Sequence, residues 1–238
     1  MHMVLYTMIV CEWLARGAPP IRRNRYPSQR MALSPDIRTQ LTGVVLAGGR
    51  ATRMGGEDKG LLRVGGRTMV QHVLNALRPQ VSDLFINANR NLQRYREFGL
   101  PVIADMIEGY CGPLAGMASA MQIARTRYLL TAPCDSPFVA TNLAERLHAQ
   151  LAEAEAQISV ANSGGQLEPV FALIDCQLLP SLLAYLQAGE RKIDRWYAQH
   201  RMVATDFSGQ PDMFLNLNTP EDISAAEARL AELSREAQ

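Results

Sequence analysis

One stretch near the start of the chain, residues 41–59 (LTGVVLAGGRATRMGGEDK), constrains the fold more than any other. Its apolar run Val44–Leu46 is typical of a buried strand. The run ends in Ala47, Gly48 and Gly49, where the near-absence of side chains lets the backbone turn sharply and approach a ligand. Backbone N–H groups that converge in such a turn bind anions, most often phosphate. Basic side chains follow at Arg50, Arg53 and Lys59. The stretch therefore predicts a strand followed by a loop that binds a polyphosphate.

Two better-known phosphate loops do not match this stretch. A P-loop ends in Gly-Lys-Ser/Thr, whereas Lys59 here follows Asp58 and precedes Gly60. The dinucleotide-binding fingerprint needs three glycines at fixed offsets, whereas the next glycine after Gly49 is Gly55. The pattern Leu-Ala-Gly-Gly, three residues, Arg-Met-Gly, three residues, Lys instead resembles the signature loop of nucleotidyltransferases.

The composition is that of an ordinary globular enzyme. The chain has 238 residues and a net charge of +1, with 47% hydrophobic and 20% charged residues. This balance gives no electrostatic reason to expect nucleic acid or a membrane surface as a partner. The four cysteines lie far apart, without a Cys-x-x-Cys pair. A structural zinc site and a disulfide scaffold are therefore poorly supported, and a reducing cytoplasm is expected.

Residues 1–40 differ from the rest of the chain. They carry six arginines against two acidic residues, and their Gly-Ala-Pro-Pro stretch is typical of irregular chain. The apolar run 3–10 is too short to span a bilayer and lacks the flanks of a signal peptide. We interpret 1–40 as a disordered N-terminal extension or an overlong start, rather than a phosphate-binding arm, and 41–238 as the nucleotidyltransferase domain. Deleting 1–38 is expected to leave the melting temperature nearly unchanged.

From residue 41 onward, short apolar runs alternate with amphipathic segments. Thr68 is expected to cap a helix that Pro79 ends, and Thr141 to cap another. Expected strands cover 44–46, 83–89, 101–104, 128–132, 158–161 and 169–174, and short extended segments cover 203–207 and 213–217. Further helices are expected over 92–98, 112–124, 176–187, 192–199 and 220–235. This alternation predicts an α/β fold of three layers, in which a mostly parallel, Rossmann-like sheet has helices on both faces.

Polar side chains follow several of the expected strands at their carboxyl ends, where open parallel sheets bind ligands. Asn87 and Asn89 close the second strand, Asp105 follows the third, and Asp135 follows the fourth. Asp135 lies between two prolines that restrict its backbone, and a carboxylate beside a polyphosphate is the usual ligand of magnesium. Cys134 has no evident histidine partner, so we interpret it as a small buried residue rather than a nucleophile.

Two further segments are candidates for ligand contact. The sequence 112–116 (GPLAG) lets backbone approach a flat ligand such as a base, or is an ordinary loop with proline at the first helical position. In 214–220 (FLNLNTP), Asn216 and Asn218 lie on one side of an extended segment. Their amides can contact a second ligand or a metal-bound water, and Asn218 is equally suited to a turn before a helix.

With these residues identified, the chain resembles the molybdenum cofactor guanylyltransferase family over residues 42–222. The resemblance rests on LAGGRATRMGGEDKG, INANR, Asp105, GPLAG, PCDSPF, EPVFAL and FLNLNTPED. Residues 1–40 have no counterpart in it. Cytidylyl and sugar-phosphate nucleotidyltransferases share the opening loop, but the combination of LAGG, CDSP and NLNTPED favours the guanylyl family.

The resemblance implies the transfer of GMP from GTP to molybdenum-molybdopterin, which gives the molybdopterin guanine dinucleotide and pyrophosphate, with Mg²⁺ as cofactor. It implies catalytic roles for Lys59, Asp135 and Arg53, with Asp135 as the metal ligand. The implied GTP site consists of Leu46, Ala47, Gly48, Gly49, Lys59, Asn87, Asp105 and Asp135. Asn216 and Asn218 are the candidates for the pterin side.

The expected partners follow from this reaction. They are GTP and the molybdopterin cofactor as substrates, with transient contacts to cofactor-delivery or acceptor proteins, no nucleic acid and no membrane. We expect a cytoplasmic monomer. Two alternatives stay open: a related enzyme that uses CTP or a sugar phosphate, and a catalytically silent nucleotide-binding protein. Arg53, Lys59 and Asp135 argue against the silent protein, because such a protein need not keep them.

Overall fold

The computed structural model describes residues 35–48, 58–107, 112–215, 217 and 219–236. The sequence-based assignments for Gly49, Arg53, Asn216 and Asn218 therefore lie outside the described residues. Within these ranges, no helix is both long and apolar enough to cross a bilayer.

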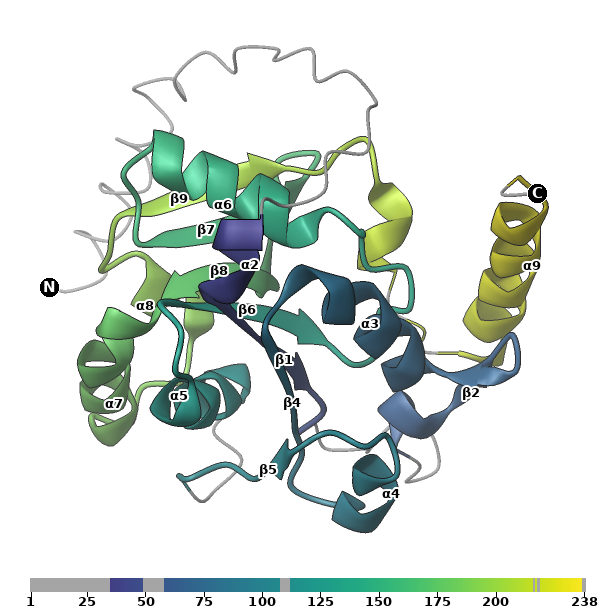
Figure 1. Ribbon diagram of the computed structural model, residues 1–238, viewed down its shortest axis with the longest axis horizontal. Coiled ribbons are helices and arrows are strands. Elements are labelled where there is room, and N and C mark those ends of the chain that lie inside the picture. Colours follow the sequence, from purple (N-terminus) through teal and green to yellow (C-terminus); the bar gives the residue numbers. More distant parts are fainter. Residues whose placement is uncertain (1–34, 49–57, 108–111, 216, 218, 237–238) are drawn as a thin grey trace, which may run out of the picture. The chain divides into compact units, whose positions relative to one another are not determined.

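A seven-stranded sheet forms the centre of the described part of the chain (Figure 1). Its strand order is β5-β4-β1-β6-β8-β7-β9. The strands are β1 (Leu41–Leu46), β4 (Asp83–Asn87), β5 (Val102–Ile103), β6 (Tyr128–Pro133), β7 (Ile158–Ser163), β8 (Gln166–Asp175) and β9 (Met202–Asp206). A separate hairpin pairs β2 (Arg63–Val64) with β3 (Arg67–Thr68).

Most neighbouring strands of the large sheet run parallel. β1 pairs in parallel with β4 and β6, β4 with β5, and β7 with β9. β8 is antiparallel to both β6 and β7. Because Tyr128 pairs with Asp175 and Thr131 with Ala172, the first residues of β8 lie past the paired part of β6, toward its carboxyl end. The predicted mostly parallel α/β sheet is confirmed.

Helices cover both faces of the sheet (Figure 1). The helices are α3 (Met69–Leu77), α4 (Leu92–Arg96), α5 (Pro113–Ile123), α6 (Leu143–Glu153), α7 (Leu179–Gln187), α8 (Ile193–Tyr197) and α9 (Pro220–Glu236). Val45 packs in a core with α3 and α6, whereas its neighbour Val44 packs in a second core with α5, α7 and α8. Adjacent residues of a strand point to opposite faces, so both faces of β1 are buried and its apolar run is explained.

Several predicted boundaries agree with the structure. Thr68 caps α3 as predicted, because its Oγ1 accepts a hydrogen bond from the Gln71 N–H at 3.3 Å. The turn between β7 and β8 contains Gly164 and Gly165, whose φ angles of +58° and +94° suit glycine. Pro113 occupies the first turn of α5, one of the two interpretations of the GPLAG segment.

The predicted cap at Thr141 is wrong. Helix α6 begins at Leu143, and its N-cap residue Asn142 makes no side-chain capping bond. Instead, Gln80 Oε1 accepts a hydrogen bond from the Ala144 N–H at 2.8 Å, and Gln80 Nε2 donates to the Ala140 carbonyl at 2.9 Å. A side chain more than sixty positions away in the sequence therefore satisfies a free N–H of this helix terminus.

The extended conformation expected over 213–217 does not hold for Met213 and Phe214, whereas Leu215 is extended. Residues Pro211–Phe214 form a 3-10 helix, in which Met213 is buried. The Phe214 ring packs edge-on against Phe171 and Phe207, with ring centroids 5.4 and 6.4 Å away. Packing of these side chains into the core outweighs the weak extended pattern of so short a segment.

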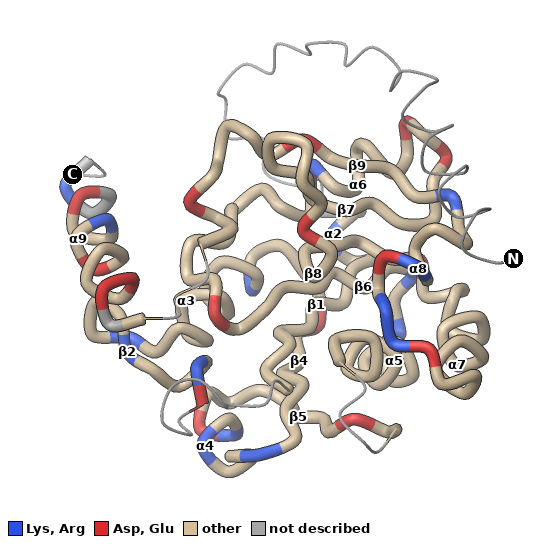
Figure 2. The backbone as a smooth tube through the Cα atoms, turned by 180° about the vertical axis from the view of Figure 1, so that it is seen from behind, with Lys and Arg blue, Asp and Glu red and all other residues tan. Residues whose placement is uncertain are grey.

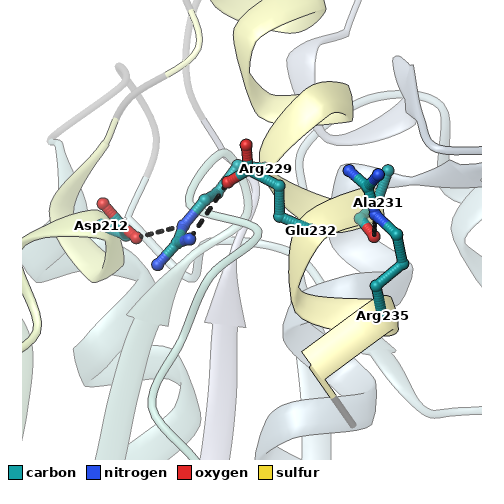
Figure 3. Close-up of polar contacts among 5 residues, drawn as sticks. All are labelled: Asp212, Arg229, Ala231, Glu232 and Arg235. Atoms are coloured by element: carbon teal, nitrogen blue, oxygen red, sulfur yellow. Dashed lines mark hydrogen bonds and ion pairs between the residues drawn. The ribbon is translucent and has the colours of Figure 1, made fainter. Parts of the chain in front are cut away.

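The hairpin β2–β3 and helix α9 lie far apart in the sequence and meet in the structure. Gly65 and Gly66 turn the hairpin with φ angles of +57° and +80°, and the Gly65 N–H donates to Glu227 Oε1 at 3.1 Å. Ala226 and Leu230 of α9 pack with Val64 of the hairpin. At its other side, Arg229 donates to Asp212 at 2.9 Å and to Glu232 at 3.2 Å (Figure 3). These contacts attach the C-terminal helix to the domain.

A short helix, α2 (Pro35–Thr39), precedes β1. It lies inside the stretch 1–40 that the sequence assigns to an irregular extension, so that assignment does not hold for these five residues. Ile37 packs against the core that contains α3, and Arg38 Nε donates to the Val81 carbonyl at 2.9 Å. The packed part of the chain therefore begins before Leu41.

These contacts change the expected effect of truncation. Deleting residues 1–38 removes Ile37 and Arg38, whereas deleting 1–34 keeps both. We expect the shorter chain to lose about 1 kcal/mol of stability relative to the longer one, a fall of roughly 2–4 °C in melting temperature for a domain of this size. Equal melting temperatures of the two truncated proteins would show that α2 contributes nothing. Arg38→Ala in the chain that starts at residue 35 isolates the bond to Val81.

Candidate active site

The carboxyl ends of β5, β4, β1 and β6 lie in register at one edge of the sheet. Leu46 is paired with Asn87 on one side and with Pro133 on the other. Beyond the last pair, the Ala47 N–H donates to the Asn87 carbonyl at 2.8 Å, and the Cys134 N–H donates to the Leu46 carbonyl at 3.1 Å. The strands that lead into the candidate residues therefore end side by side, and hydrogen bonds between neighbouring strands hold these ends together.

Asp105 is held by two asparagines at this edge. Asn87 Nδ2 donates to Asp105 Oδ1 at 2.9 Å, and Asn89 Nδ2 donates to Asp105 Oδ2 at 2.7 Å. The Asp105 N–H in turn donates to Asn89 Oδ1 at 2.8 Å. Each carboxylate oxygen thus accepts one amide hydrogen bond and keeps a further lone pair for a ligand. The structure brings these three predicted polar residues together.

Two glycines allow the backbone to close around Asn87. A Cβ at Gly116 would lie 2.3 Å from Asn87 Oδ1 and 2.8 Å from a methyl of Leu46. A Cβ at Gly48 would lie 3.2 Å from Asn89 Nδ2 and 3.4 Å from Asn87 Oδ1. The first turn of α5 and the start of the glycine loop therefore both pack against the same amide. This is a structural reason for the second glycine of GPLAG that the sequence did not reveal.

Lys59 and Asp135 face each other across the ends of the strands. Lys59 opens the 3-10 helix η1 (Lys59–Leu61), and Asp135 follows β6. Lys59 Nζ lies 3.7 Å from Asp135 Oδ2, and the side chains are 26% and 22% exposed. Both charged groups reach solvent and can exchange this partner for a ligand. The structure thus brings together two of the predicted site residues, although the sequence did not predict that they pair with each other.

The described residues suit magnesium held jointly with a substrate. No group of three or more His, Cys, Asp or Glu side chains in the described part of the chain could form a metal cage. Magnesium in nucleotide enzymes is usually held by one or two carboxylates together with substrate phosphates and water. Asp135, partly exposed just past the end of β6, provides such a carboxylate.

Cys134 is unsuited to nucleophilic chemistry, in agreement with the sequence interpretation. Burial raises the pKa of its thiol well above the usual value, and the negative charges of Asp135 and Asp58 raise it further. The thiolate, not the thiol, is the reactive form. His72 and His148 are engaged elsewhere, the first with the Val64 carbonyl and the second against the Tyr128 ring.

Sequence reasoning missed a buried carboxylate next to Lys59. Asp58 is only 5% exposed. Its Oδ1 accepts from the Tyr95 hydroxyl at 2.7 Å, and its Oδ2 accepts from Asn91 Nδ2 at 3.2 Å. The signals in the sequence are weak, because a Tyr in an amphipathic helix and an Asp in a glycine-rich loop are both common on their own.

Comparison with known proteins identifies the family. The model of the MobA-like NTP transferase domain matches residues 43–203. A molybdenum cofactor guanylyltransferase of Shewanella halifaxensis is 50% identical over 182 residues, which are 76% of this chain and 91% of that protein. The chain belongs to the molybdenum cofactor guanylyltransferase family. A second member, from Shewanella loihica, is 49% identical over 76% of this chain and 93% of its own length.

Solved structures of low identity agree in fold. Molybdopterin-guanine dinucleotide biosynthesis protein A of Archaeoglobus fulgidus superposes with a TM-score of 0.67 at 23% identity, over 80% of this chain and 99% of that chain. The 4-diphosphocytidyl-2C-methyl-D-erythritol synthase of Anaerococcus prevotii superposes with a TM-score of 0.61 at 12% identity, over 83% of this chain and 100% of that one. The molybdenum cofactor guanylyltransferase fold is thus shared with cytidylyl enzymes, and the family assignment comes from sequence identity.

Membership of the guanylyltransferase family confirms the resemblance drawn from the motifs. It also establishes the protein as a nucleotidyltransferase.

The contact between Gly116 and Asn87 gives a prediction. Gly116→Ala places a methyl group against Asn87 Oδ1 and should cost about 1–3 kcal/mol, the usual penalty of overpacking. Thermal melts measure this loss. Gly209→Ala is the matched control, because a Cβ there meets nothing within 4 Å. Equal melting temperatures for the two variants would contradict the close contact.

Proposed function

We propose that this protein transfers GMP from GTP to the phosphate of molybdenum-molybdopterin and releases pyrophosphate. One observation carries the proposal: a chain half identical to molybdenum cofactor guanylyltransferases has Lys59 and Asp135 3.7 Å apart at the carboxyl edge of its sheet. A cation and a carboxylate that can bind magnesium, at the sheet edge where β1 ends, suit the binding of a triphosphate.

The reaction needs orientation and charge neutralisation more than proton transfer. A phosphate oxygen of the pterin substrate forms a bond to the α-phosphorus of GTP, and the bond from that phosphorus to the bridging oxygen breaks as pyrophosphate leaves. The attacking phosphate is already ionised near neutral pH, so no general base is required. Catalysis of such a transfer depends on holding both substrates in line and stabilising the charge that develops.

The glycine loop and Lys59 are proposed to hold the phosphates. The backbone of Leu46, Ala47 and Gly48 lies at the end of β1, where the sheet pairing of the strand stops and the glycine loop begins. Backbone N–H groups past that pairing are proposed to meet phosphate oxygens. Lys59 supplies a point charge to the same oxygens. Gly49 and Arg53 are assigned to this group by family resemblance, and they lie outside the described residues.

Asn87 and Asp105 are proposed to bind the guanosine. Asp105 keeps one lone pair on each oxygen beyond its bonds to Asn87 and Asn89, which can accept hydrogen bonds from donors of the nucleoside. Guanine presents two neighbouring donors on its pairing edge, whereas cytosine and adenine do not. Asn216 and Asn218, outside the described residues, are proposed for the pterin side by family resemblance.

Asp135 is proposed as the protein ligand of magnesium. When bound, the ion would neutralise charge on the phosphate oxygens and on the leaving pyrophosphate. Asp135 itself supplies a negative charge at a strand end that is open to solvent. Lys59, its partner in the structure, is thereby left to interact with the phosphates.

The remaining parts of the proposal concern the surroundings of the enzyme. We propose a monomer that acts in the cytoplasm and makes transient contacts with proteins that deliver or accept the cofactor. Support for a reducing compartment comes from the wide separation of the four cysteines in the sequence.

Nucleotide choice separates this proposal from a cytidylyl function. With magnesium present, calorimetry should show GTP binding at least tenfold more tightly than CTP or ATP, a difference of about 1.4 kcal/mol or more. The reason is the match between Asp105 and the donors of guanine. Equal or tighter binding of CTP would overturn the guanylyl assignment.

Substitutions at Lys59 and Asp135 should have different effects. Lys59→Ala is expected to weaken GTP binding and also slow turnover, because its charge acts before and during the reaction. Asp135→Asn should lower turnover roughly 100-fold, the scale of losing one strong electrostatic stabiliser. Pyrophosphate release at varied magnesium concentration measures both effects.

The stability of these variants provides the control. The Lys59–Asp135 pair is partly exposed, and such pairs contribute about 1 kcal/mol or less, so melting temperatures should change little. Asp83→Asn is the matched control for Asp135→Asn, because Asp83 is an exposed carboxylate at the opposite end of a parallel strand. Near-normal turnover of Asp135→Asn with an unchanged magnesium dependence would exclude Asp135 as the metal ligand.

A further inference from the structure

Asp58 is a buried carboxylate that the reaction itself does not use. It precedes Lys59 directly and is 5% exposed. Its partners come from the segment that begins α4: the Tyr95 hydroxyl at 2.7 Å, Asn91 Nδ2 at 3.2 Å, and Arg90 Nε at 3.6 Å as an ion pair. Figure 2 shows that basic residues gather in and around α4. The carboxylate is thus buried against one cation, Arg90, and two neutral hydrogen-bond donors.

The cost of burying Asp58 indicates a role beyond packing. An isolated carboxylate loses a large hydration free energy when it is buried, and the loss is offset only by hydrogen bonds and opposite charge. Tyr95 is itself fully buried, and burial is the main cause that raises the pKa of its hydroxyl, followed by the nearby Cys134 and Asp58. The hydroxyl therefore remains a proton donor to Asp58 at all ordinary pH values.

Asn91 has a backbone conformation that suits this contact. Its φ angle is +52°, in the left-handed region that asparagine tolerates better than most residues. The segment at the start of α4 therefore reaches Asp58 through a local conformation that costs energy for most side chains. Asn91 follows β4 by only a few residues in the chain, so the position of its amide donor is fixed relative to that strand.

The network extends to the turn that carries Lys59. The Leu61 N–H donates to the Asp58 carbonyl at 2.9 Å, which closes the turn. A Cβ at Gly60 would lie 2.7 Å from the Tyr95 hydroxyl oxygen and 3.1 Å from Cys134 Sγ. Gly60, in the middle of the turn, therefore packs closely between the side chains of Tyr95 and Cys134. Cys134 is the residue next to Asp135. Movement of Tyr95 or Asp58 must move the base of the Lys59 side chain.

We propose that Asp58, held by Tyr95 and Asn91, is a positioning residue that directs the Lys59 side chain toward the phosphates of the nucleotide. The inference rests on the proposed function of Lys59. Lysine has a long flexible side chain, so its ammonium is placed well only if its backbone is fixed. A shift of about 1 Å at a reacting group can cost as much as 100-fold in rate.

The test is a double-mutant cycle between Tyr95 and Lys59. Tyr95→Phe removes the hydroxyl that donates to Asp58 and keeps the buried ring. Its effect on the Kd of GTP and on kcat/KM is measured in the wild-type chain and in the Lys59→Ala chain. If Tyr95 acts through Lys59, Tyr95→Phe should weaken both quantities about tenfold in the wild-type chain and less than twofold in the Lys59→Ala chain.

A matched variant and a second substitution complete the experiment. Tyr185→Phe is the control, because Tyr185 is also buried and its hydroxyl donates to the Lys192 carbonyl at 2.9 Å beside α7. It should leave GTP binding unchanged. Asp58→Asn keeps the shape of the side chain, removes its charge, and should show the same dependence on Lys59 as Tyr95→Phe.

The possible results are distinct. An equal loss from Tyr95→Phe in both backgrounds would show a general structural effect and overturn the inference, as would normal binding and turnover in both Tyr95→Phe and Asp58→Asn. If the wild-type protein, supplied with GTP and molybdenum-molybdopterin, releases no pyrophosphate, the proposed function is wrong. If it does so and Tyr95 and Lys59 are uncoupled, only the positioning role is wrong.

Discussion

Backbone hydrogen bonding on both sides of β1 is the constraint on which the site depends. β1 is held by β4 on one side and β6 on the other, and the same pattern continues past its end through Ala47 and Leu46. A shift by one residue would exchange Val44 and Val45 between the two cores, so this register is strongly specified. The separate loops of the site therefore have fixed starting points.

The three carboxylates near this edge, Asp58, Asp105 and Asp135, differ in their hydrogen-bond partners. Asp58 and Asp105 accept hydrogen bonds from donors that are themselves anchored in the core or at strand ends. Asp135 instead faces a flexible lysine and remains partly exposed. The fold thus holds two of the carboxylates in fixed hydrogen-bond networks and leaves the third partly exposed beside a single lysine.

The sequence predicted most of the sheet and its helices because these elements bury regular apolar patterns. Val44–Leu46 and the helix capped by Thr68 illustrate this, since each can be recognised from neighbouring residues alone. The errors involve distant partners. Gln80 replaces the expected cap of α6, and Phe171 and Phe207 draw Phe214 into the core. Neither contact can be predicted from the residues next to it in the sequence.

The same distinction applies to the site. Asn87, Asp105, Lys59 and Asp135 were predicted from motif and strand ends, and the structure brings Asn87 to Asp105 and Lys59 to Asp135. The contact of Asp58 with Tyr95 joins residues 37 positions apart, and the close approach of Gly116 to Asn87 depends on how α5 packs. Such contacts follow from tertiary structure and cannot be read from spacing.

The reversed direction of β8 has a consequence for how this enzyme can vary. The β7–β8 hairpin turns at Gly164 and Gly165, and a register irregularity after Val160 separates its tip from the part paired deep in the sheet. Residues added or removed at that turn would lengthen or shorten only the tip, since surface turns tolerate such changes. β1, β4 and β6 would keep their pairing. Natural variation in loop length can therefore reshape this rim of the molecule while the central parallel strands stay as they are.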